Sequence, residues 1–354
     1  MVNGRAMRRT HPTRLLFTLF ALVALVAAGC GDDGGSDDAA ADDPNAETTT
    51  TAEEMSEDAA SWPVEIEHVY GTTTIDEQPE SVASASVSMT GHLLAADAPV
   101  VASMTTSPES PIADENGFFL QWADVAVDGG VEAIPGPEIN IEAIAAAEPD
   151  LIVGSAVGGD AVDEETYGLL SEIAPTIVLD HSGTTWQDLT TVLGEAVGHP
   201  DAAEASIASF DELVAEVAAG NDPTNEVVAL VHNPDGMNVF TAESAHGQLL
   251  ESLGYTLHEL PEGATAESDN EGGNRSDIVA VSLENASTAF GDSTIFFVLD
   301  DQDTIDALGT EQAVLGALPA FEEGRAVALG PTSFRLDWFS ATDVAELIGE
   351  LTAG

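Results

Sequence analysis

Two series of short apolar runs, separated by a long helical segment, constrain the fold of this chain most strongly. The runs are rich in β-branched residues and lie at 99–104, 149–156, 175–180, 226–233, 295–301 and 325–330. Between them lie stretches of helical period, such as IEAIAAAE and HGQLLESLG. This regular alternation predicts α/β architecture with mainly parallel sheets.

The segment between the two series predicts how the chain divides into domains. Residues 186–219 contain no strand-like run and keep apolar residues at helical spacing, with a new helix start just after Pro200. A helical stretch of this length between two α/β halves is typical of a connector. We therefore expect an N-terminal lobe over 62–184, a connecting helix over 185–224 and a C-terminal lobe over 225–354.

The N-terminus carries an export signal. A basic start with four arginines precedes the apolar run LLFTLFALVALVAAG, which ends in small residues just before Cys30. This run is too short and too well bounded for a membrane span. Residues 1–29 are therefore predicted to be a signal peptide.

Cys30 is the single cysteine of the sequence. Its position after VAAG resembles the lipobox of bacterial lipoproteins, in which the cysteine is lipidated and becomes the new N-terminus. Ala27 stands where that pattern prefers Leu, so a general signal peptide with an incidental cysteine is the alternative. Residues 30–61 are rich in Gly, Ala, Thr and acids, which predicts a disordered acidic linker. We expect a globular body held at the membrane through a lipid anchor only.

The charge balance of the chain is extreme. Its 64 Asp and Glu residues stand against 7 Lys and Arg, for a formal net charge of −57. Nucleic acid is excluded as a partner, because binding it requires a basic surface that displaces counterions. Since 44% of the residues are apolar, a core can still form, and we interpret the acid as solvated surface. A high-salt habitat explains such a surface, because the Debye length falls to about 3 Å at 1 M. An alkaline habitat or a charge-dependent partner is the alternative.

The few cations stand out against this background. The sequence has no lysine, and removal of the signal leaves Arg275, Arg325 and Arg335. A guanidinium suits a planar or polydentate oxyanion, since it offers a rigid fork of donors and stays charged. Arg335 lies in the aromatic stretch TSFRLDWFSA, and we interpret it as a ligand contact. Arg325 follows two glutamates in FEEGRAVALG, which favours a structural ion pair, whereas Arg275 in NEGGNRSD fits either role.

No catalytic constellation is recognisable. A P-loop needs a lysine, a serine hydrolase needs a G-x-S-x-G elbow, and the sequence has neither. The exported histidines include no H-x-H or H-x-x-x-H pair, which disfavours a metal site, and His181 and His246 are predicted to be ordinary loop residues. The glycines of VGSAVGGD, Gly158 among them, follow a strand without dinucleotide-binding spacing and predict a loop that lines a cleft. We expect no catalysis, no catalytic residues and no cofactor.

Seven stretches carry a family resemblance over about 65–350: GTTTIDEQPESVASASVSMTGHLLAADAPVVAS, GFFLQWADVA, IEAIAAAEPDLIVGSAVGGD, YGLLSEIAPTIVLD, WQDLTTVLGEAVGH, FTAESAHGQLLESLGYTL and TSFRLDWFSA. Together they resemble the substrate-binding proteins of ABC importers for iron–siderophores, most closely the ferric-enterobactin-binding branch. The resemblance implies two Rossmann-like lobes joined by a long connecting helix. It also implies that a ferric siderophore is held between the lobes and delivered to an ABC permease and ATPase complex, with iron carried inside the ligand.

The resemblance further implies individual contacts. Arg335, in the F-R-L-D motif, matches the arginine that contacts a ferric catecholate in similar proteins. Phe240, just before T-A-E-S-A, matches an aromatic contact. Trp122 and Gly158 are further predicted ligand contacts, and Arg275 is predicted to contribute from the other side of the ligand. Permease contacts are expected at two acidic positions, Glu142 in NIEAI and Glu284 in SLENA.

Two departures from the family pattern bear on the ligand. Pro111 and Leu120 occupy positions where relatives carry a basic residue. A ferric catecholate is also a multiply charged anion, which the acidic surface repels except where salt screens it. A catecholate complex remains the first expectation, with a hydroxamate complex or a corrinoid as alternatives. Outside the class, a secreted siderophore esterase is the alternative, and the missing serine elbow argues against it.

Overall fold

The computed structural model describes residues 62–353, apart from 183, 222, 235 and 265–276. The predicted signal peptide, Cys30, the acidic linker and Arg275 lie outside the described residues. Within the described ranges, no helix has both the length and the apolar character that crossing a membrane requires.

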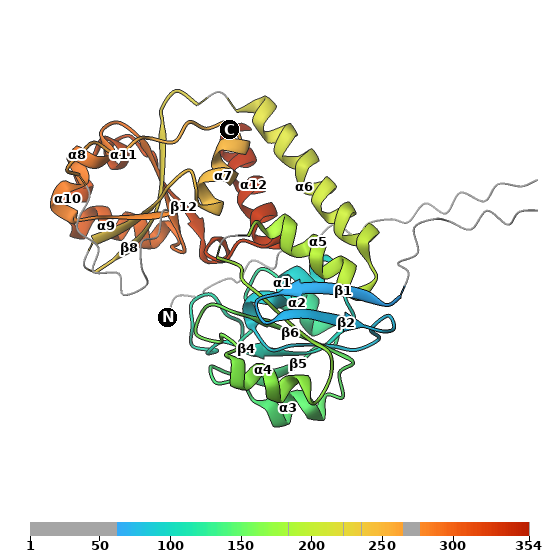
Figure 1. The fold of residues 1–354 in the computed structure, drawn as a ribbon. Helices are drawn as coiled ribbons and strands as arrows, with labels where there is room; N and C mark the ends of the chain where they lie inside the picture. The colour runs from blue at the N-terminus through green and yellow to red at the C-terminus, as the bar shows by residue number, and fades with distance from the viewer. Residues whose placement is uncertain (1–61, 183, 222, 235, 265–276, 354) are drawn as a thin grey trace, which may run out of the picture. The chain divides into compact units, whose positions relative to one another are not determined.

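A five-stranded parallel sheet forms the centre of the first lobe (Figure 1). Its order is β5-β4-β3-β6-β7, and every pairing in it is parallel. The strands are β3 (Val82–Ser84), β4 (Val100–Thr105), β5 (Glu132–Pro135), β6 (Leu151–Ser155) and β7 (Thr176–Leu179). A separate antiparallel hairpin consists of β1 (Val64–His68) and β2 (Gly71–Ile75).

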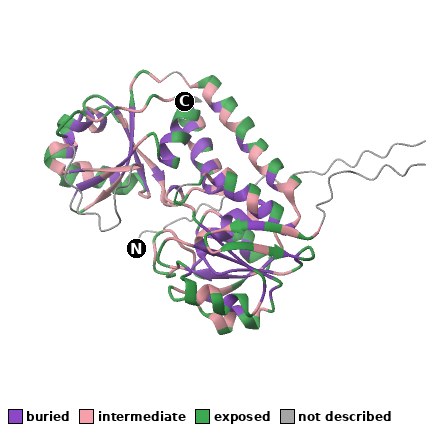
Figure 2. Cartoon of the chain, viewed as in Figure 1, coloured by how far each residue is buried: buried purple, intermediate pink, exposed green. Residues whose placement is uncertain are grey.

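Helices cover both faces of this sheet. Along β6 the side chains alternate: Leu151 and Val153 join an apolar cluster with Leu93, whereas Ile152 joins a second cluster with Ile144. All five positions of β6 are consequently buried (Figure 2). The helices are α1 (Val87–Ala95), α2 (Ala123–Asp128), α3 (Ile141–Ala146) and α4 (Glu164–Ser171).

The second lobe repeats this strand order. Its sheet runs β10-β9-β8-β11-β12, so in both sheets the third strand is followed by the second, first, fourth and fifth. β9 is antiparallel to both neighbours, and the remaining pairings are parallel. The strands are β8 (Val227–Asn233), β9 (Gly236–Phe240), β10 (Ile278–Val281), β11 (Thr294–Val298) and β12 (Ala326–Gly330). The expectation of α/β architecture with mainly parallel sheets is confirmed.

Two groups of helices enclose the second sheet. One face packs on α8 to α11, and the other packs on α7 and the C-terminal helix. These elements are α7 (Ala245–Ser252), η1 (Leu283–Asn285), α8 (Ala286–Phe290), α9 (Gln302–Glu311), α10 (Ala313–Gly316), α11 (Pro319–Glu322), η2 (Pro331–Ser333) and α12 (Trp338–Ala353).

The connector consists of two helices, where the sequence predicted one connecting helix over 185–224. They are α5 (Trp186–Val197) and α6 (Pro200–Gly220). The break comes at Gly198, which caps α5 in the left-handed conformation with φ of 74°, and Pro200 then starts α6. The core of the first lobe includes Leu193 of α5, whereas α6 lies beside α12 (Figure 1) and packs into the core of the second.

The start of α12 also contacts the first lobe. Phe339 packs against the apolar cluster of the first lobe, and α12 is in contact with α1. Val344 and Ile348, further along α12, belong to the core of the second lobe. The C-terminal segment therefore joins both lobes, although the predicted boundary assigns all of it to the second.

Candidate functional site

The loops that follow the carboxyl ends of the parallel strands carry the candidate site. Open α/β sheets bind ligands outside this edge, because the strands end there and the following loops lie exposed. In the first lobe, β6 leads to Gly158 and Asp160, and β7 leads to His181. In the second lobe, β12 leads through η2 to Arg335.

Arg335 is held by its backbone and leaves its side chain exposed. Its guanidinium carbon lies 5.0 Å from the centroid of the Phe334 ring, a cation–π contact. Its carbonyl oxygen accepts hydrogen bonds from Ser340 Oγ at 2.8 Å and from Gln121 Nε2 at 3.4 Å. Gln121 belongs to the first lobe, so this backbone is tied to both lobes.

The charge of Arg335 acts on one histidine in each lobe. The pKa of His181 is lowered mainly by burial and then by Arg335, while Asp160 and Asp180 oppose the shift. The pKa of His246 falls to about 4, mainly by burial, against a hydrogen bond to Ser333 and with a smaller contribution from Arg335. The sequence predicted both histidines to be ordinary loop residues. His181 lies in the loop after β7, but for His246 the prediction is wrong, because it is a buried residue of α7 that Ser244 caps.

His92, in α1, interacts electrostatically with His181. Its side chain is buried, and its pKa falls to about 3 because of burial and the nearby His181. Neither His92 Nδ1 nor His181 Nε2 has a hydrogen-bond partner within the part of the chain that the structure describes. Buried polar atoms are usually paired, so these two nitrogens are consistent with a site that a ligand completes.

The loop after β6 supplies a carboxylate that is already engaged. Asp160 Oδ2 accepts hydrogen bonds from Ser86 Oγ at 2.6 Å and from the backbone N–H of Val87 at 2.9 Å, at the start of α1. Gly158 has a φ of 104°, which a glycine adopts without strain, and it lies exposed in this loop. The loop is thus shaped by Gly158 and fastened to α1 by Asp160.

The two aromatic candidates are more deeply buried than the sequence led us to expect. Phe240 ends β9 with 8% of its surface exposed, and its ring stacks on His246 with centroids 4.1 Å apart. Trp122 is 1% exposed and packs between Phe118 and Phe119 in the first lobe. In this conformation both rings belong to cores, and ligand contact by either stays a prediction.

Glu142 and Glu284 occupy equivalent connections in the two lobes. Glu142 lies in the first turn of α3, and Glu284 in the first turn of η1. Each element follows the third strand of its sheet and precedes the fourth. Both side chains are exposed, and Glu142 also lines an open hollow over 135–142.

Arg325 forms the structural ion pair that its sequence context predicts. Its guanidinium contacts Asp292 Oδ1 at 2.5 Å and Glu323 Oε2 at 3.0 Å, and Nη1 donates to the carbonyl oxygen of Asp292. This prediction is confirmed. No group of three or more His, Cys, Asp or Glu among the described residues is arranged to hold a metal ion.

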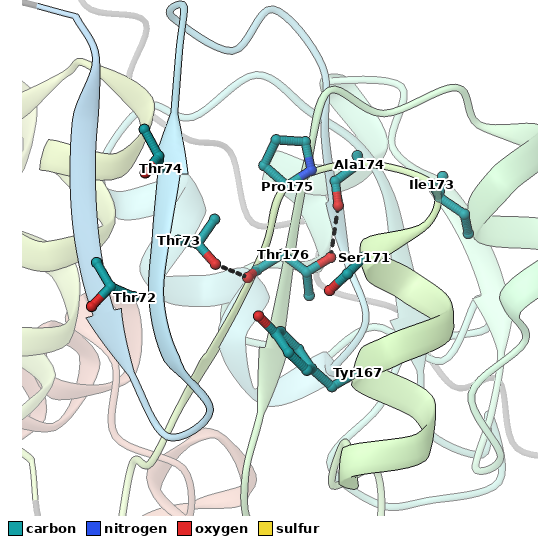
Figure 3. A pocket seen from close by; sticks show the side chains of 9 residues that line it. All are labelled: Thr72, Thr73, Thr74, Tyr167, Ser171, Ile173, Ala174, Pro175 and Thr176. Atoms are coloured by element: carbon teal, nitrogen blue, oxygen red, sulfur yellow. Dashed lines mark hydrogen bonds between the residues drawn. The ribbon is translucent and has the colours of Figure 1, made fainter.

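The first lobe also carries a hollow (Figure 3). It is lined by Thr72, Thr73, Thr74, Tyr167, Ser171, Ile173, Ala174, Pro175 and Thr176, none of them charged. The hydroxyls of Thr73 and Thr176 already donate to backbone carbonyls. Because Pro175 and Thr176 lie at the amino end of β7 and His181 follows its carboxyl end, this hollow is not part of the candidate site.

The sequence and the fold were compared with those of known proteins. Residues 82–331 match the family described as periplasmic binding protein. The chain belongs to this family. It is 40% identical over 299 residues to the ferric enterobactin-binding periplasmic protein FepB of Escherichia coli O6:H1, covering 83% of this chain and 92% of that protein.

Solved structures agree with the periplasmic binding protein assignment. The crystal structure of holo-ViuP superposes with a TM-score of 0.70 at 31% identity, covering 81% of this chain and 94% of that one. The siderophore-binding protein BauB, bound to two molecules of acinetobactin and ferric iron, gives a TM-score of 0.60 at 21% identity, with coverages of 82% and 98%, which speaks for the fold. The resemblance inferred from the seven stretches is confirmed.

Proposed function

We propose that this periplasmic binding protein captures a ferric siderophore outside the cytoplasm and delivers it to an ABC permease. Membership in the family supports binding and delivery rather than catalysis. FepB, a ferric enterobactin-binding protein that shares 40% identity over most of the chain, supports a ferric siderophore as the cargo. The iron then belongs to the transported ligand and is not a cofactor of the protein.

The ligand class we propose is a ferric catecholate of the enterobactin type. The observation that carries this proposal is the position of Arg335, which follows η2 of the second lobe, accepts a hydrogen bond from Gln121 of the first through its carbonyl oxygen, and leaves its side chain exposed. An anionic chelate beside Arg335 receives charge-assisted hydrogen bonds from its guanidinium. Nε2 of His181, which has no hydrogen-bond partner among the described residues, offers one further polar contact from the first lobe.

The acidic surface restricts when such a ligand can associate. With a formal net charge of −57, the protein repels an anionic chelate over long distances. Salt screens this repulsion, because the Debye length falls to about 3 Å at 1 M. Binding then depends on local contacts rather than on steering. We therefore expect ferric catecholate to associate faster as the salt concentration rises, the reverse of what an electrostatically attracted ligand shows.

The proposed cellular position is the outer face of the cell membrane, with a lipid on Cys30 as the only anchor. The small-residue run before this cysteine supports the proposal. Cys30→Ser removes the thiol that would carry the lipid, and the variant is expected in the medium or periplasm instead of the membrane fraction. Intact mass measurement on the parent protein gives an independent check. Unchanged membrane fractionation of the variant contradicts the anchor and leaves ligand capture intact.

The proposed ligand is tested by mass spectrometry of small molecules that co-purify with the protein from iron-starved native cells. A direct titration at molar salt, followed by tryptophan fluorescence, compares ferric enterobactin, a neutral ferric hydroxamate and a corrinoid. Saturable quenching by ferric enterobactin alone supports the proposal. Saturation by one of the other two keeps the transport role and replaces the ligand class, whereas turnover of any of them indicates an esterase.

A further inference from the structure

Asp337, the last residue of the F-R-L-D motif, is a buried carboxylate with two separate sets of contacts. Only 3% of its surface is exposed. One oxygen, Oδ1, accepts from the backbone N–H of Ser340 at 2.9 Å, and Ser340 Oγ in turn accepts from the N–H of Asp337 at 2.8 Å. This reciprocal pair is a capping box that starts α12.

The second oxygen of Asp337 is directed to the first lobe. Gln121 Nε2 donates to Asp337 Oδ2 at 3.2 Å, and the same nitrogen lies 3.4 Å from the carbonyl oxygen of Arg335. Gln121 immediately precedes Trp122 at the start of α2. One first-lobe amide therefore holds both the side chain of Asp337 and the backbone of Arg335.

Gly91, in α1, leaves the space that this contact requires. A Cβ atom at Gly91 would overlap Oδ2 and Cγ of Asp337, so only a glycine lets the α1 backbone come so close. Phe339 packs against the apolar cluster of the first lobe beside this contact. The carboxylate is thus enclosed by α1 on one side and by Gln121 on the other.

These contacts exceed what a helix cap needs. Ser340 alone completes the capping box, whereas Gln121 and Gly91 come from the other lobe and add nothing to the start of α12. Arg335 lies two residues before Asp337, and its carbonyl is bonded to Ser340 and Gln121, the two partners of the Asp337 carboxylate.

We propose that Asp337 is a positioning residue: through Gln121 and Gly91 it fixes the backbone of Arg335 against the first lobe and so preorganises the guanidinium for the ligand. The proposal rests on the proposed function, in which Arg335 contacts the ligand. An arginine that is held before the ligand arrives loses less conformational freedom on binding. Loss of Asp337 should therefore weaken binding only while Arg335 is present.

Two variants separate positioning from capping. Asp337→Ser keeps an N-cap side chain for α12 but cannot reach Gln121. Gln121→Ala leaves the capping box complete and removes the hydrogen bonds that Gln121 donates to Asp337 and to the carbonyl oxygen of Arg335. Asp301→Ser is the matched control, because Asp301 caps α9 through Thr304 N without contact to the first lobe.

The first readout needs no ligand. The pKa of His181, followed by NMR of the histidine ring, should rise toward its ordinary value in Arg335→Ala, because the guanidinium that lowers it is gone. Asp337→Ser and Gln121→Ala should move it in the same direction, and Asp301→Ser should not. An unchanged His181 pKa in both test variants overturns the proposal, whichever ligand the protein binds.

The second readout is the dissociation constant for ferric enterobactin at molar salt. We expect Asp337→Ser to weaken binding about tenfold in the parent and less than about twofold in an Arg335→Ala background, since residues that act through one another are not additive. Equal losses in both backgrounds contradict positioning. If the parent binds no ferric catecholate, the proposed ligand fails, and the His181 titration alone decides the role of Asp337.

Discussion

The imidazole of His246 stacks on the ring of Phe240, with the ring centroids 4.1 Å apart and the planes 29° from parallel. Nε2 of His246 donates to the carbonyl oxygen of Ser333 at 2.7 Å, which fixes the tautomer and ties α7 to η2. Because η2 leads directly into Arg335, the stack supports the segment that carries the candidate ligand contact. Phe240 thus has a structural task whether or not it also contacts a ligand.

Two substitutions at Phe240 separate these roles. Phe240→Ala should lower the free energy of unfolding by about 3–5 kcal/mol, because it leaves a cavity in the core of the second lobe. Phe240→Leu keeps most of the volume and should cost less, while it removes the aromatic face. Chemical denaturation gives the stability, and titration with ferric enterobactin gives the affinity. An affinity that is unchanged in Phe240→Leu assigns Phe240 to the core alone.

The buried carboxyl of Asp337 predicts a pH-dependent stability difference. Burial raises its pKa to about 6, against the opposing hydrogen bonds from Ser340, Gln121 and the backbone. The folded state therefore holds this proton more tightly than the unfolded state, whose pKa is near 3.8. This contribution favours folding at pH values below about 4 and is lost as the pH rises through about 6.

Asp337→Asn isolates that contribution, because asparagine caps a helix but does not ionise. The difference in unfolding free energy between Asp337→Asn and the parent should shift in favour of the variant between pH 4 and pH 6, by roughly 2–3 kcal/mol, and stay constant above pH 7. Thermal unfolding in molar sodium chloride at each pH measures it. The matched control is Asp301→Asn, since hydrogen bonds from Thr304 lower the pKa of Asp301 and reverse the trend. A pH-independent difference for Asp337→Asn contradicts the raised pKa.

The acidic composition predicts a strong effect of salt on stability. Removal of the signal would leave three arginines against 64 carboxylates, and two of the three, Arg325 and Arg335, lie within the described residues. Screening reduces the repulsion among these carboxylates, so the melting temperature should rise substantially between low and molar salt. Sucrose at matched osmolality serves as the control for a general cosolvent effect. A melting temperature that does not change with the sodium chloride concentration contradicts the high-salt interpretation.

The acidic residues Glu142 and Glu284 are predicted to meet the permease, one from each lobe. Their equivalent places after the third strand of each sheet support the pairing. Reversal of both charges to arginine should abolish iron–siderophore uptake in cells while the purified protein binds its ligand as before. The control reverses two other exposed glutamates, Glu148 after α3 in the first lobe and Glu311 at the end of α9 in the second. Normal uptake by the Glu142 and Glu284 double variant discards the assignment.

The α/β architecture could be predicted from the sequence, because parallel strands that are buried on both faces appear as continuous apolar runs. β6, buried on both faces, is one such run, and the long helical stretch between the two series marks the connector. The division of that stretch into α5 and α6 was harder to foresee, because it depends on the left-handed conformation of Gly198 as much as on Pro200.

The residues of the candidate site could be predicted only in part. Arg335 stood out because cations are so rare, but nothing in the sequence separated His181 from other loop residues, since partial burial is a property of the folded chain. Asp337 was hidden among 64 acids, and only its burial and its contact with Gln121 distinguish it. A histidine directly after the apolar run PTIVLD was the one available signal, because the carboxyl ends of parallel strands meet at one edge.

The last prediction concerns the contribution of Arg335 to ligand affinity. In a partly desolvated site a charge-assisted contact contributes about 1.5–3 kcal/mol, which corresponds to one to two decades in dissociation constant. Few other cations can compensate, because Pro111 and Leu120 are uncharged and Arg325 is committed to Asp292 and Glu323. Arg335→Ala should therefore weaken ferric enterobactin binding at least about tenfold at molar salt.

The matched variants at this position test the chemistry of the contact. Arg335→Lys should recover only part of the affinity, since an ammonium reproduces neither the guanidinium fork nor the stacking on Phe334. Arg325→Ala removes an arginine of the same lobe that is already paired, and it should lower stability while leaving affinity nearly unchanged. Tight binding by Arg335→Ala would assign Arg335 to the structure of the segment before α12. In that case the ligand must be held by the histidines and the loop after β6, and substitution of His181 becomes the deciding experiment.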